Sequence, residues 1–298
     1  MQSLTLSPPP VMHQDRRSFL ALLGAAAAGC VAGKPETAAD LMKSATPPSS
    51  PHRIGVQLYT VRDAAAKDLP GTLARIAEIG YRDVEFAGYH GRTPAEIRDL
   101  LTRFNLGAPS SHIPVASLRG DWKKALDEAK TIGHEFVTIP WLGDGDTSSV
   151  DAWKRVAELF NRGGADAKAA GLRFAYHNHD FEFRRIGDVV PFDVLLAETD
   201  PALVSYEMDI YWLVKAGHDP MAYFTRYPNR FTMVHVKDSA GPPEHRMVDV
   251  GAGAIDFARV LPRAVASGVK HVFVEHDQPA DAMASITASY QHLAKLAF

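Results

Sequence analysis

The sequence predicts one α/β domain, a single (β/α)8 TIM barrel, over residues 53–298. From Ile54 onward, short runs rich in β-forming residues alternate with longer amphipathic runs, which is the pattern of strand–helix units in a parallel sheet. Eight such units can be counted, and their combined length is close to the roughly 250 residues of a typical eightfold barrel. An open doubly wound sheet is the alternative. It lacks support because no predicted strand is followed by a Gly-x-Gly-x-x-Gly phosphate loop.

The predicted elements follow in regular order. The strands are expected at 54–58, 83–86, 108–112, 136–140, 172–177, 203–209, 231–237 and 271–275. Amphipathic helices are expected between them, at 69–79, 94–104, 122–132, 150–170 and 255–267. Several of these end at a glycine, which relieves the left-handed conformation past a helix C-terminus: Gly80, Gly133, Gly171 and Gly268.

The first 30 residues predict a twin-arginine export signal rather than a buried helix. Asp15-Arg16-Arg17-Ser18-Phe19-Leu20 precedes an apolar run at 21–29 that is too short to span a bilayer. Cys30 is the only cysteine, so an internal disulfide is excluded. Either a peptidase cuts near it, or Cys30 is lipidated and anchors the protein to a membrane. Residues 31–52 have the composition of a Pro/Ser-rich linker. We therefore expect a protein that meets the twin-arginine export machinery and reaches the periplasm, or is otherwise exported.

Composition limits the function classes. The chain is 46% hydrophobic and carries a formal net charge of -3, which suits a large globular core and gives no basic field for nucleic acid or anionic lipid. A metal-dependent endonuclease would need cationic surface for phosphates, so the charge argues against it. Small substrates with little charge fit better. The oligomeric state is left open.

Polar side chains stand at the ends of the predicted strands, where an inner barrel face otherwise favours bulky branched residues. In order they are Gln57, Glu85, His112, Trp141, His177 with His179, Glu207 with Asp209, His235 with Lys237, and Glu275 with Asp277. All these ends meet at one mouth of a barrel, so ligand-type side chains from four strands are able to converge on one divalent cation. Those four are His177, Asp209, His235 and Glu275. A barrel histidine taken alone is more often a hydrogen-bonded core residue, but four such strands together favour a metal site.

Short motifs at the strand ends also carry a resemblance to a known family. They are Gly55-Val56-Gln57-Leu58-Tyr59, Val84-Glu85-Phe86, Ser111-His112, Tyr176-His177-Asn178-His179-Asp180, Glu207-Met208-Asp209, His235-Val236-Lys237-Asp238, Gly251-Ala252-Gly253-Ala254-Ile255-Asp256-Phe257 and Val274-Glu275-His276. In this order and spacing they resemble the xylose isomerase-like barrel superfamily of sugar phosphate isomerases, epimerases and inosose dehydratases. The resemblance covers nearly all of residues 53–298.

The resemblance implies one bound divalent ion, manganese before magnesium, cobalt or zinc. Family members hold it with a Glu on strand five, an Asp on strand six, a His on strand seven and a Glu on strand eight. Asp209, His235 and Glu275 match the last three positions. Strand five departs from the pattern, because His177 stands where many members have the glutamate, and the ligand there is His177 or His179. Since the two glutamates of family epimerases exchange protons on opposite faces of the substrate, this departure raises lyase chemistry as a rival.

A cation held in this way would bind adjacent oxygens of a hydroxy-ketone, acidify the carbon between them and stabilise the resulting enediolate. The candidate bases are Glu275, His177 and Lys237. Substrate contacts are expected from Gln57, Glu85, His112, Trp141, His179 and Arg246, with Tyr59, Trp141 and Trp212 as stacking surfaces for a sugar. Arg246 would contact a phosphate or carboxylate.

Two classes of function remain. The first is an exported, metal-dependent isomerase or epimerase for a keto sugar or cyclitol, with a lyase acting on an inosose or 3-keto glycoside as the alternative. The second is a non-catalytic periplasmic sugar-binding protein. A cation beside carboxylates and histidines is of little use to a pure receptor, so the sequence favours the enzyme.

Overall fold

The computed structural model describes residues 53–298. The predicted signal at 1–30, including Cys30, and the predicted linker at 31–52 lie outside the described residues. Within 53–298, no helix combines the length and the apolar character needed to cross a membrane.

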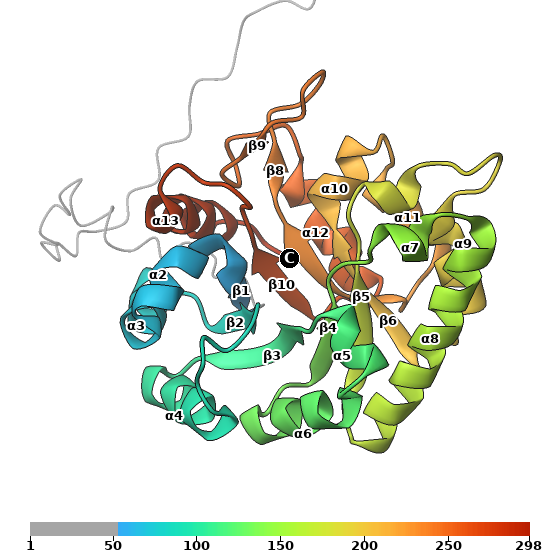
Figure 1. The fold of residues 1–298 in the computed structure, drawn as a ribbon. Helices are drawn as coiled ribbons and strands as arrows, with labels where there is room; N and C mark the ends of the chain where they lie inside the picture. The colour runs from blue at the N-terminus through green and yellow to red at the C-terminus, as the bar shows by residue number, and fades with distance from the viewer. Residues whose placement is uncertain (1–52) are drawn as a thin grey trace, which may run out of the picture. The chain divides into compact units, whose positions relative to one another are not determined.

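Eight parallel strands close into one barrel within residues 53–298, with neighbours in the order β1-β10-β7-β6-β5-β4-β3-β2 (Figure 1). They are β1 (Ile54–Gln57), β2 (Asp83–Phe86), β3 (Gly107–His112), β4 (Phe136–Ile139), β5 (Arg173–His177), β6 (Val204–Asp209), β7 (Phe231–Val236) and β10 (His271–Val274). The predicted barrel is confirmed. The open-sheet alternative is wrong, because β1 pairs with both β2 and β10 and so leaves no sheet edge.

Helices surround the strands on the outside of the barrel (Figure 1). They are α2 (Arg62–Lys67), α3 (Leu69–Ile79), α4 (Pro94–Phe104), α5 (Val115–Arg119), α6 (Trp122–Ile132), α7 (Asp144–Thr147), α8 (Val150–Ala169), α9 (Pro191–Glu198), α10 (Ile210–Lys215), α11 (Pro220–Arg226), α12 (Phe257–Ala266) and α13 (Ala282–Leu293), with short 3-10 turns η1 (Leu58–Val61) and η2 (Phe181–Phe183). The chain signals its helix ends locally. Thr93 and Glu96 form a capping box at the start of α4, and Gly133 takes a φ of 99° at the end of α6.

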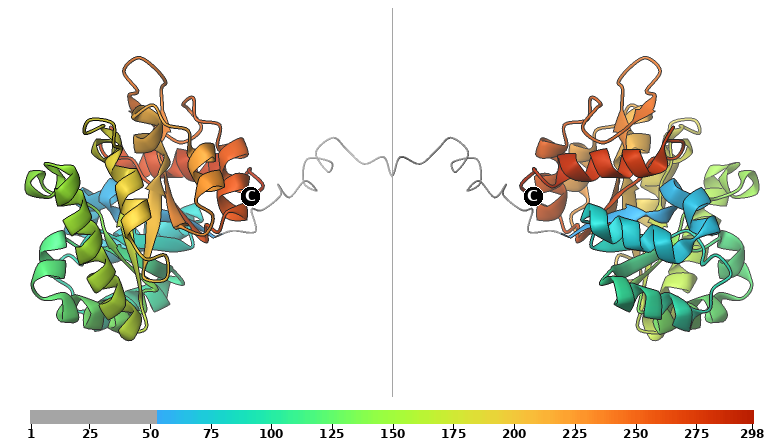
Figure 2. Two further views of the ribbon diagram at one scale, coloured as in Figure 1. Left: turned by 90° about the vertical axis from the view of Figure 1, so that its right-hand side faces the viewer. Right: turned by 90° about the vertical axis from the view of Figure 1, so that its left-hand side faces the viewer.

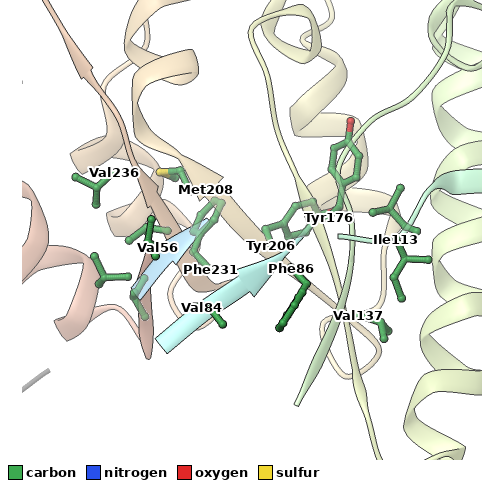
Figure 3. Packing of buried hydrophobic residues seen from close by; sticks show 14 of the residues in the cluster. Val56, Val84, Phe86, Ile113, Val137, Tyr176, Tyr206, Met208, Phe231 and Val236 are labelled. Carbon is green, nitrogen blue, oxygen red and sulfur yellow. The ribbon is translucent and has the colours of Figure 1, made fainter. Parts of the chain in front are cut away.

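Alternation along the strands separates two layers of side chains. Val56, Val84 and Val137 are fully buried in the main apolar cluster that joins strands to helices (Figure 3). A separate, smaller apolar cluster is made by residues from four strands: Phe136, Ala175, Met233 and Phe273. Because side chains two apart share a face of a strand, Ala175, Met233 and Phe273 stand one step below His177, His235 and Glu275 on the inner face. They form an apolar floor under the barrel mouth.

A small antiparallel hairpin, β8 (Asp238–Ser239) with β9 (Met247–Val248), stands away from the barrel (Figure 2). The chain after it is organised by the buried carboxylate of Asp238, which accepts backbone N–H groups from Gly251, Gly253 and Ile255 at 2.9, 3.0 and 3.2 Å. A Cβ on Gly253 would overlap this carboxylate, so glycine is required there. The sequence did not predict this hairpin.

Candidate active site and metal centre

The mouth of the barrel holds a cavity of about 630 Å³, within the roughly 300–1,000 Å³ of small-molecule sites. Six of the predicted site residues line it: His112, Trp141, His177, His179, Lys237 and Glu275. Tyr59, Trp212 and Asp277 also contribute to its wall. Gln57 and Glu85 do not line this cavity, and Arg246 lines a neighbouring one.

Four predicted metal ligands converge at the wall of this cavity. One donor atom from each of His177, Asp209, His235 and Glu275, called here the four-donor cluster, lies within 4.8 Å of every other, and all four side chains are buried. Nε2 of His177 is 3.3 Å from Oδ2 of Asp209, and Nδ1 of His235 is 2.7 Å from Oε2 of Glu275.

The four-donor cluster fits a divalent ion. Both ring nitrogens of His177 and Oδ2 of Asp209 are buried without a hydrogen-bond partner, although buried polar atoms are nearly always paired. Asp209 Oδ2 does have close charged neighbours, but none of these contacts has hydrogen-bond geometry. Two imidazoles and two carboxylates are ligands that zinc, manganese and related ions accept. The cluster is therefore able to hold a metal ion.

The ammonium of Lys237 sits among the carboxylates. Its Nζ lies 3.1 Å from Oδ2 of Asp209, 2.7 Å from Oε2 of Glu275 and 2.7 Å from Oδ1 of Asp277. Burial by itself would lower the pKa of Lys237, but these carboxylates raise it well above its ordinary value. Burial in turn raises the pKa of Glu275, and the charges of Lys237 and His235 bring it well below its ordinary value. At neutral pH the mouth therefore contains a protonated amine next to an ionised carboxylate.

His235 joins the four-donor cluster to a second buried network. Its Nε2 lies 2.6 Å from Oε2 of Glu85 and 3.2 Å from Oε2 of Glu207, and His112 Nε2 lies 2.9 Å from the same Glu207 oxygen. Gln57 donates its side-chain N–H to Glu85 at 2.7 Å. A metal-bound histidine typically gives its other ring N–H to a carboxylate, and Glu85 is placed to receive it. Glu85 thus contacts His235 directly and Gln57 supports Glu85, and neither residue lines the cavity.

The buried carboxyl groups and His235 of this network shift one another's pKa. Burial and the neighbouring Glu207 raise the pKa of Glu85. Burial would lower the pKa of His235, but the carboxylates around it, Glu207 foremost, raise it well above its ordinary value. Without a metal, His235 is therefore an imidazolium among the carboxyl groups of Glu85, Glu207 and Glu275. A cation at Nδ1 would replace one of its protons, so metal binding there is linked to proton release.

The two histidines of the strand-five segment are placed differently. His177 belongs to the four-donor cluster, whereas the ring of His179 packs edge-on against Trp141 with centroids 4.8 Å apart. Burial, followed by the charge of His235, lowers the pKa of His177 to about 4. The His177 ring is then neutral at pH 7, which is the form that binds metals. The structure favours His177 over His179 as the strand-five ligand.

Glu182, which the sequence analysis did not single out, fixes this segment. It is fully buried in η2, where one carboxylate oxygen accepts the Tyr176 hydroxyl at 2.6 Å and the other accepts the His179 backbone N–H at 2.9 Å. Burial raises the pKa of Glu182 to about 8. Asn178 adds a second tie, because its side chain bonds both backbone groups of Asp209, at 3.1 and 3.3 Å. The only sequence signal for either residue is its closeness to the strand-five histidines.

Aromatic side chains form the rim. Trp141 and Tyr59 are 53% and 42% exposed and line the cavity, in agreement with the predicted position of a stacking surface. Trp212 belongs to both this cavity and the neighbouring one. Arg246 lines only the neighbouring cavity.

Comparisons with known proteins agree with this fold. The model of the xylose isomerase-like TIM barrel family matches residues 73–296. An inosose dehydratase from Lacticaseibacillus casei is 35% identical over 88 residues, which are 30% of this chain and 29% of that enzyme. The match therefore spans less than a third of this relative's length.

Solved structures extend the likeness over the barrel. A sugar phosphate isomerase/epimerase from Parabacteroides distasonis ATCC 8503 superposes with a TM-score of 0.73 at 27% identity, over 85% of this chain and 96% of that one. The IOLI protein, solved with a zinc atom, shares the fold with a TM-score of 0.67 at 13% identity, over 81% of this chain and 96% of that one. With its closed barrel and its family match over most of its length, the chain belongs to the xylose isomerase-like TIM barrel family.

Proposed function

We propose that this protein is an exported, divalent-metal-dependent sugar isomerase or epimerase, which acts through an enediolate on a keto sugar or a cyclitol. The observation that carries the proposal is the four-donor cluster, two of whose residues, His177 and Glu275, line the same cavity as Lys237. A receptor that only binds sugar has no need for this combination of buried donors and ionised groups. The likeness to the sugar phosphate isomerase/epimerase of Parabacteroides distasonis supports the same reading.

The proposed cofactor is one divalent ion, manganese before zinc, magnesium or cobalt, held by the four-donor cluster. When bound, it would supply Lewis-acid polarisation of two neighbouring substrate oxygens. Glu85 would hold the His235 ring in position from behind, at 2.6 Å from its Nε2.

The chain's own residues would move the proton. Glu275 lines the cavity and has a lowered pKa, so it is ionised and able to accept a proton from the substrate carbon. Lys237 has a raised pKa and therefore stays protonated, so it would place a positive charge and an N–H hydrogen-bond donor beside the oxygen on which negative charge develops. His177, with a pKa of about 4, is neutral at pH 7 and would serve as a ligand. His112 and His179 line the cavity and are positioned to orient hydroxyl groups.

Elimination is the second candidate. On strand five, the neutral His177 stands where a second glutamate would exchange protons on the opposite face of the substrate. One carboxylate base, Glu275, and one acid, Lys237, are therefore better supported than a pair of carboxylate bases. Base and acid together are what removal of a proton and a hydroxyl group requires. The partial match to an inosose dehydratase points the same way.

Proton exchange distinguishes the two reactions. Manganese-loaded protein would be incubated in D2O with 2-keto-myo-inositol and with unphosphorylated ketohexoses. Isomerisation or epimerisation incorporates deuterium without loss of water, whereas elimination gives a product lighter by a water molecule. We expect Glu275→Gln to stop either reaction, while the exposed control Glu198→Gln on α9 reacts as the wild type. Metal-loaded wild type that neither exchanges nor eliminates with any of these substrates would contradict the proposal.

The location of the protein is part of the proposal. The proposal of twin-arginine export rests on residues 15–30. Membrane anchoring through a lipidated Cys30 is the alternative outcome of the same route. Because that route carries folded proteins, the metal would be inserted before export.

A further inference from the structure

A second cavity of about 880 Å³ adjoins the one at the barrel mouth. The two cavities share three lining residues: Trp212, Asp277 and Gln278. Each cavity alone has the size of a complete small-molecule site, roughly 300–1,000 Å³. The mouth therefore has room for two ring-sized groups next to each other.

The second cavity lacks the groups of the proposed reaction, although His276 also lines it. Among the described residues, its lining includes no member of the four-donor cluster and not Lys237. Its walls come from the β8–β9 hairpin, the chain after β10 and the first turn of α13, with Arg246, Val248 and Ala284 as examples. A group bound there would be held without being transformed. It would be a substituent of the reacting ring.

The charges of the second cavity disfavour an anion. Asp249 and Asp281 line it against a single arginine, Arg246, and the shared Asp277 is already paired with Lys237 at 2.7 Å. Because carboxylates outnumber the cation, a phosphate or carboxylate ligand would meet net repulsion. A neutral occupant therefore suits this cavity better than an anionic one.

Its walls suit a hydroxylated ring. Tyr211 and Trp212 supply aromatic surface, and their rings lie 4.9 Å apart at the T-shaped angle of 69°. Carboxylates and the side-chain amide of Gln278 supply hydrogen-bond partners. An aromatic wall with polar groups around it matches the apolar face and equatorial hydroxyls of a pyranose.

We propose that the substrate carries a second, neutral sugar ring, joined to the reacting keto ring by a glycosidic bond, and that this ring occupies the second cavity. Trp212 forms the common wall between the two rings. The inference rests on the proposed function, because the first cavity must hold the reacting ring. A free monosaccharide or cyclitol would use only one of the two cavities.

Titration calorimetry on the manganese-loaded full-length chain tests the inference with probes that cannot form an enediolate. The one-ring probe is methyl β-D-glucopyranoside, and the two-ring probes are methyl β-cellobioside, methyl α-maltoside and trehalose. We expect at least one two-ring probe to bind about tenfold or more tightly than the one-ring probe, a difference of about 1.4 kcal/mol.

Variants that fill the second cavity test whether the tighter binding of the two-ring probe arises there. Ala284→Trp and Ala252→Trp each add an indole at an exposed alanine of its lining and should remove the advantage of the two-ring probe while the one-ring affinity is kept. Ala288→Trp is the matched control, because Ala288 is exposed on the same helix one turn away and does not line the cavity.

The outcomes separate the two proposals. Binding of the one-ring probe with no gain for any two-ring probe would overturn the inference and leave the proposed function in place. Equal weakening of both probe types by the filling variants would overturn it as well. If metal-loaded protein binds no sugar of either kind, the proposed function fails and the inference fails with it.

Discussion

At the level of single residues, Lys237 balances the charge of the barrel mouth. Its ammonium lies within 3.1 Å of Asp209, Glu275 and Asp277, and it is almost fully buried. A divalent cation in the four-donor cluster would share two of these carboxylates with it. Lys237 and the metal would therefore neutralise the same carboxylates. If either cation is removed, the other alone compensates their negative charge.

We predict that Lys237→Met destabilises the metal-free protein by about 3–5 kcal/mol, because it leaves buried carboxylates without their partner. Added Mn²⁺ should restore more stability to this variant than to the wild type, since the ion then meets uncompensated charge. Urea denaturation in EDTA and in Mn²⁺ measures both effects. The control is Lys215→Met, whose ammonium lies over the Trp212 ring at 4.4 Å. Equal stability of the wild type and Lys237→Met in EDTA would refute this account.

Glu182 gives the fold a pH dependence. Burial raises its pKa to about 8, so from about pH 5 to pH 8 the folded protein keeps a proton that the unfolded chain has lost. Stability should fall as pH rises through this window. Glu182→Gln cannot ionise, and we predict that the wild type loses roughly 2–4 kcal/mol relative to this variant between pH 5 and pH 8. Unfolding free energies at both pH values measure the difference, with Glu198→Gln expected to follow the wild type. Parallel pH profiles of stability for the wild type and Glu182→Gln would show that the pKa of the Glu182 carboxyl is not raised in the folded protein.

At the level of strands and loops, β1 and β10 pack closely against each other beneath the four-donor cluster. A Cβ at Gly55 would overlap the ring of Phe273, and that ring lies 6.1 Å from the ring of His235. We predict that Gly55→Ala costs about 1–3 kcal/mol through overpacking. Phe273→Leu should recover part of this loss in the double variant, because the two sites are in contact.

Chemical denaturation of the single and double variants measures the coupling between Gly55 and Phe273. Gly143→Ala is the control, because its φ of -86° is open to any residue and no atom lies within 4 Å of the added Cβ. Additive effects of Gly55→Ala and Phe273→Leu would mean that the predicted overlap is absent.

Regular elements were predictable from the sequence, and the hairpin was not. Each barrel strand is long enough to show its apolar pattern, so all eight were found within one residue of their bounds. The two strands of the β8–β9 hairpin have two residues each, which is too short for any period. Its following loop depends on Asp238 binding amides 13 to 17 residues further along, and no local rule reports such a contact.

For the barrel as a complete domain, topology explains which site residues could be predicted. Closing the sheet brings every strand end to one mouth, so candidate donors far apart in sequence, such as Asp209 and Glu275, could be expected close together from their positions alone. The depth of each side chain within the barrel could not be predicted in this way. Gln57 and Glu85 stand at strand ends like the others, but the closed register places them behind His235 rather than in the cavity. Arg246 lies on the hairpin and lines the second cavity rather than the first, so its predicted substrate contact stays a prediction.

The central claim is that the four-donor cluster holds one divalent ion, and metal analysis of purified protein tests it most directly. Asp209→Asn is the informative variant, because asparagine keeps an oxygen for the N-cap bond to the Trp212 N–H while it removes a charged ligand. Asp277→Asn is the control, a carboxylate of the same mouth outside the cluster. We predict close to one divalent ion per chain in the wild type and in Asp277→Asn, and little in Asp209→Asn. A wild type that contains no metal and takes up none on titration, or an Asp209→Asn variant that keeps its full complement, would contradict the claim.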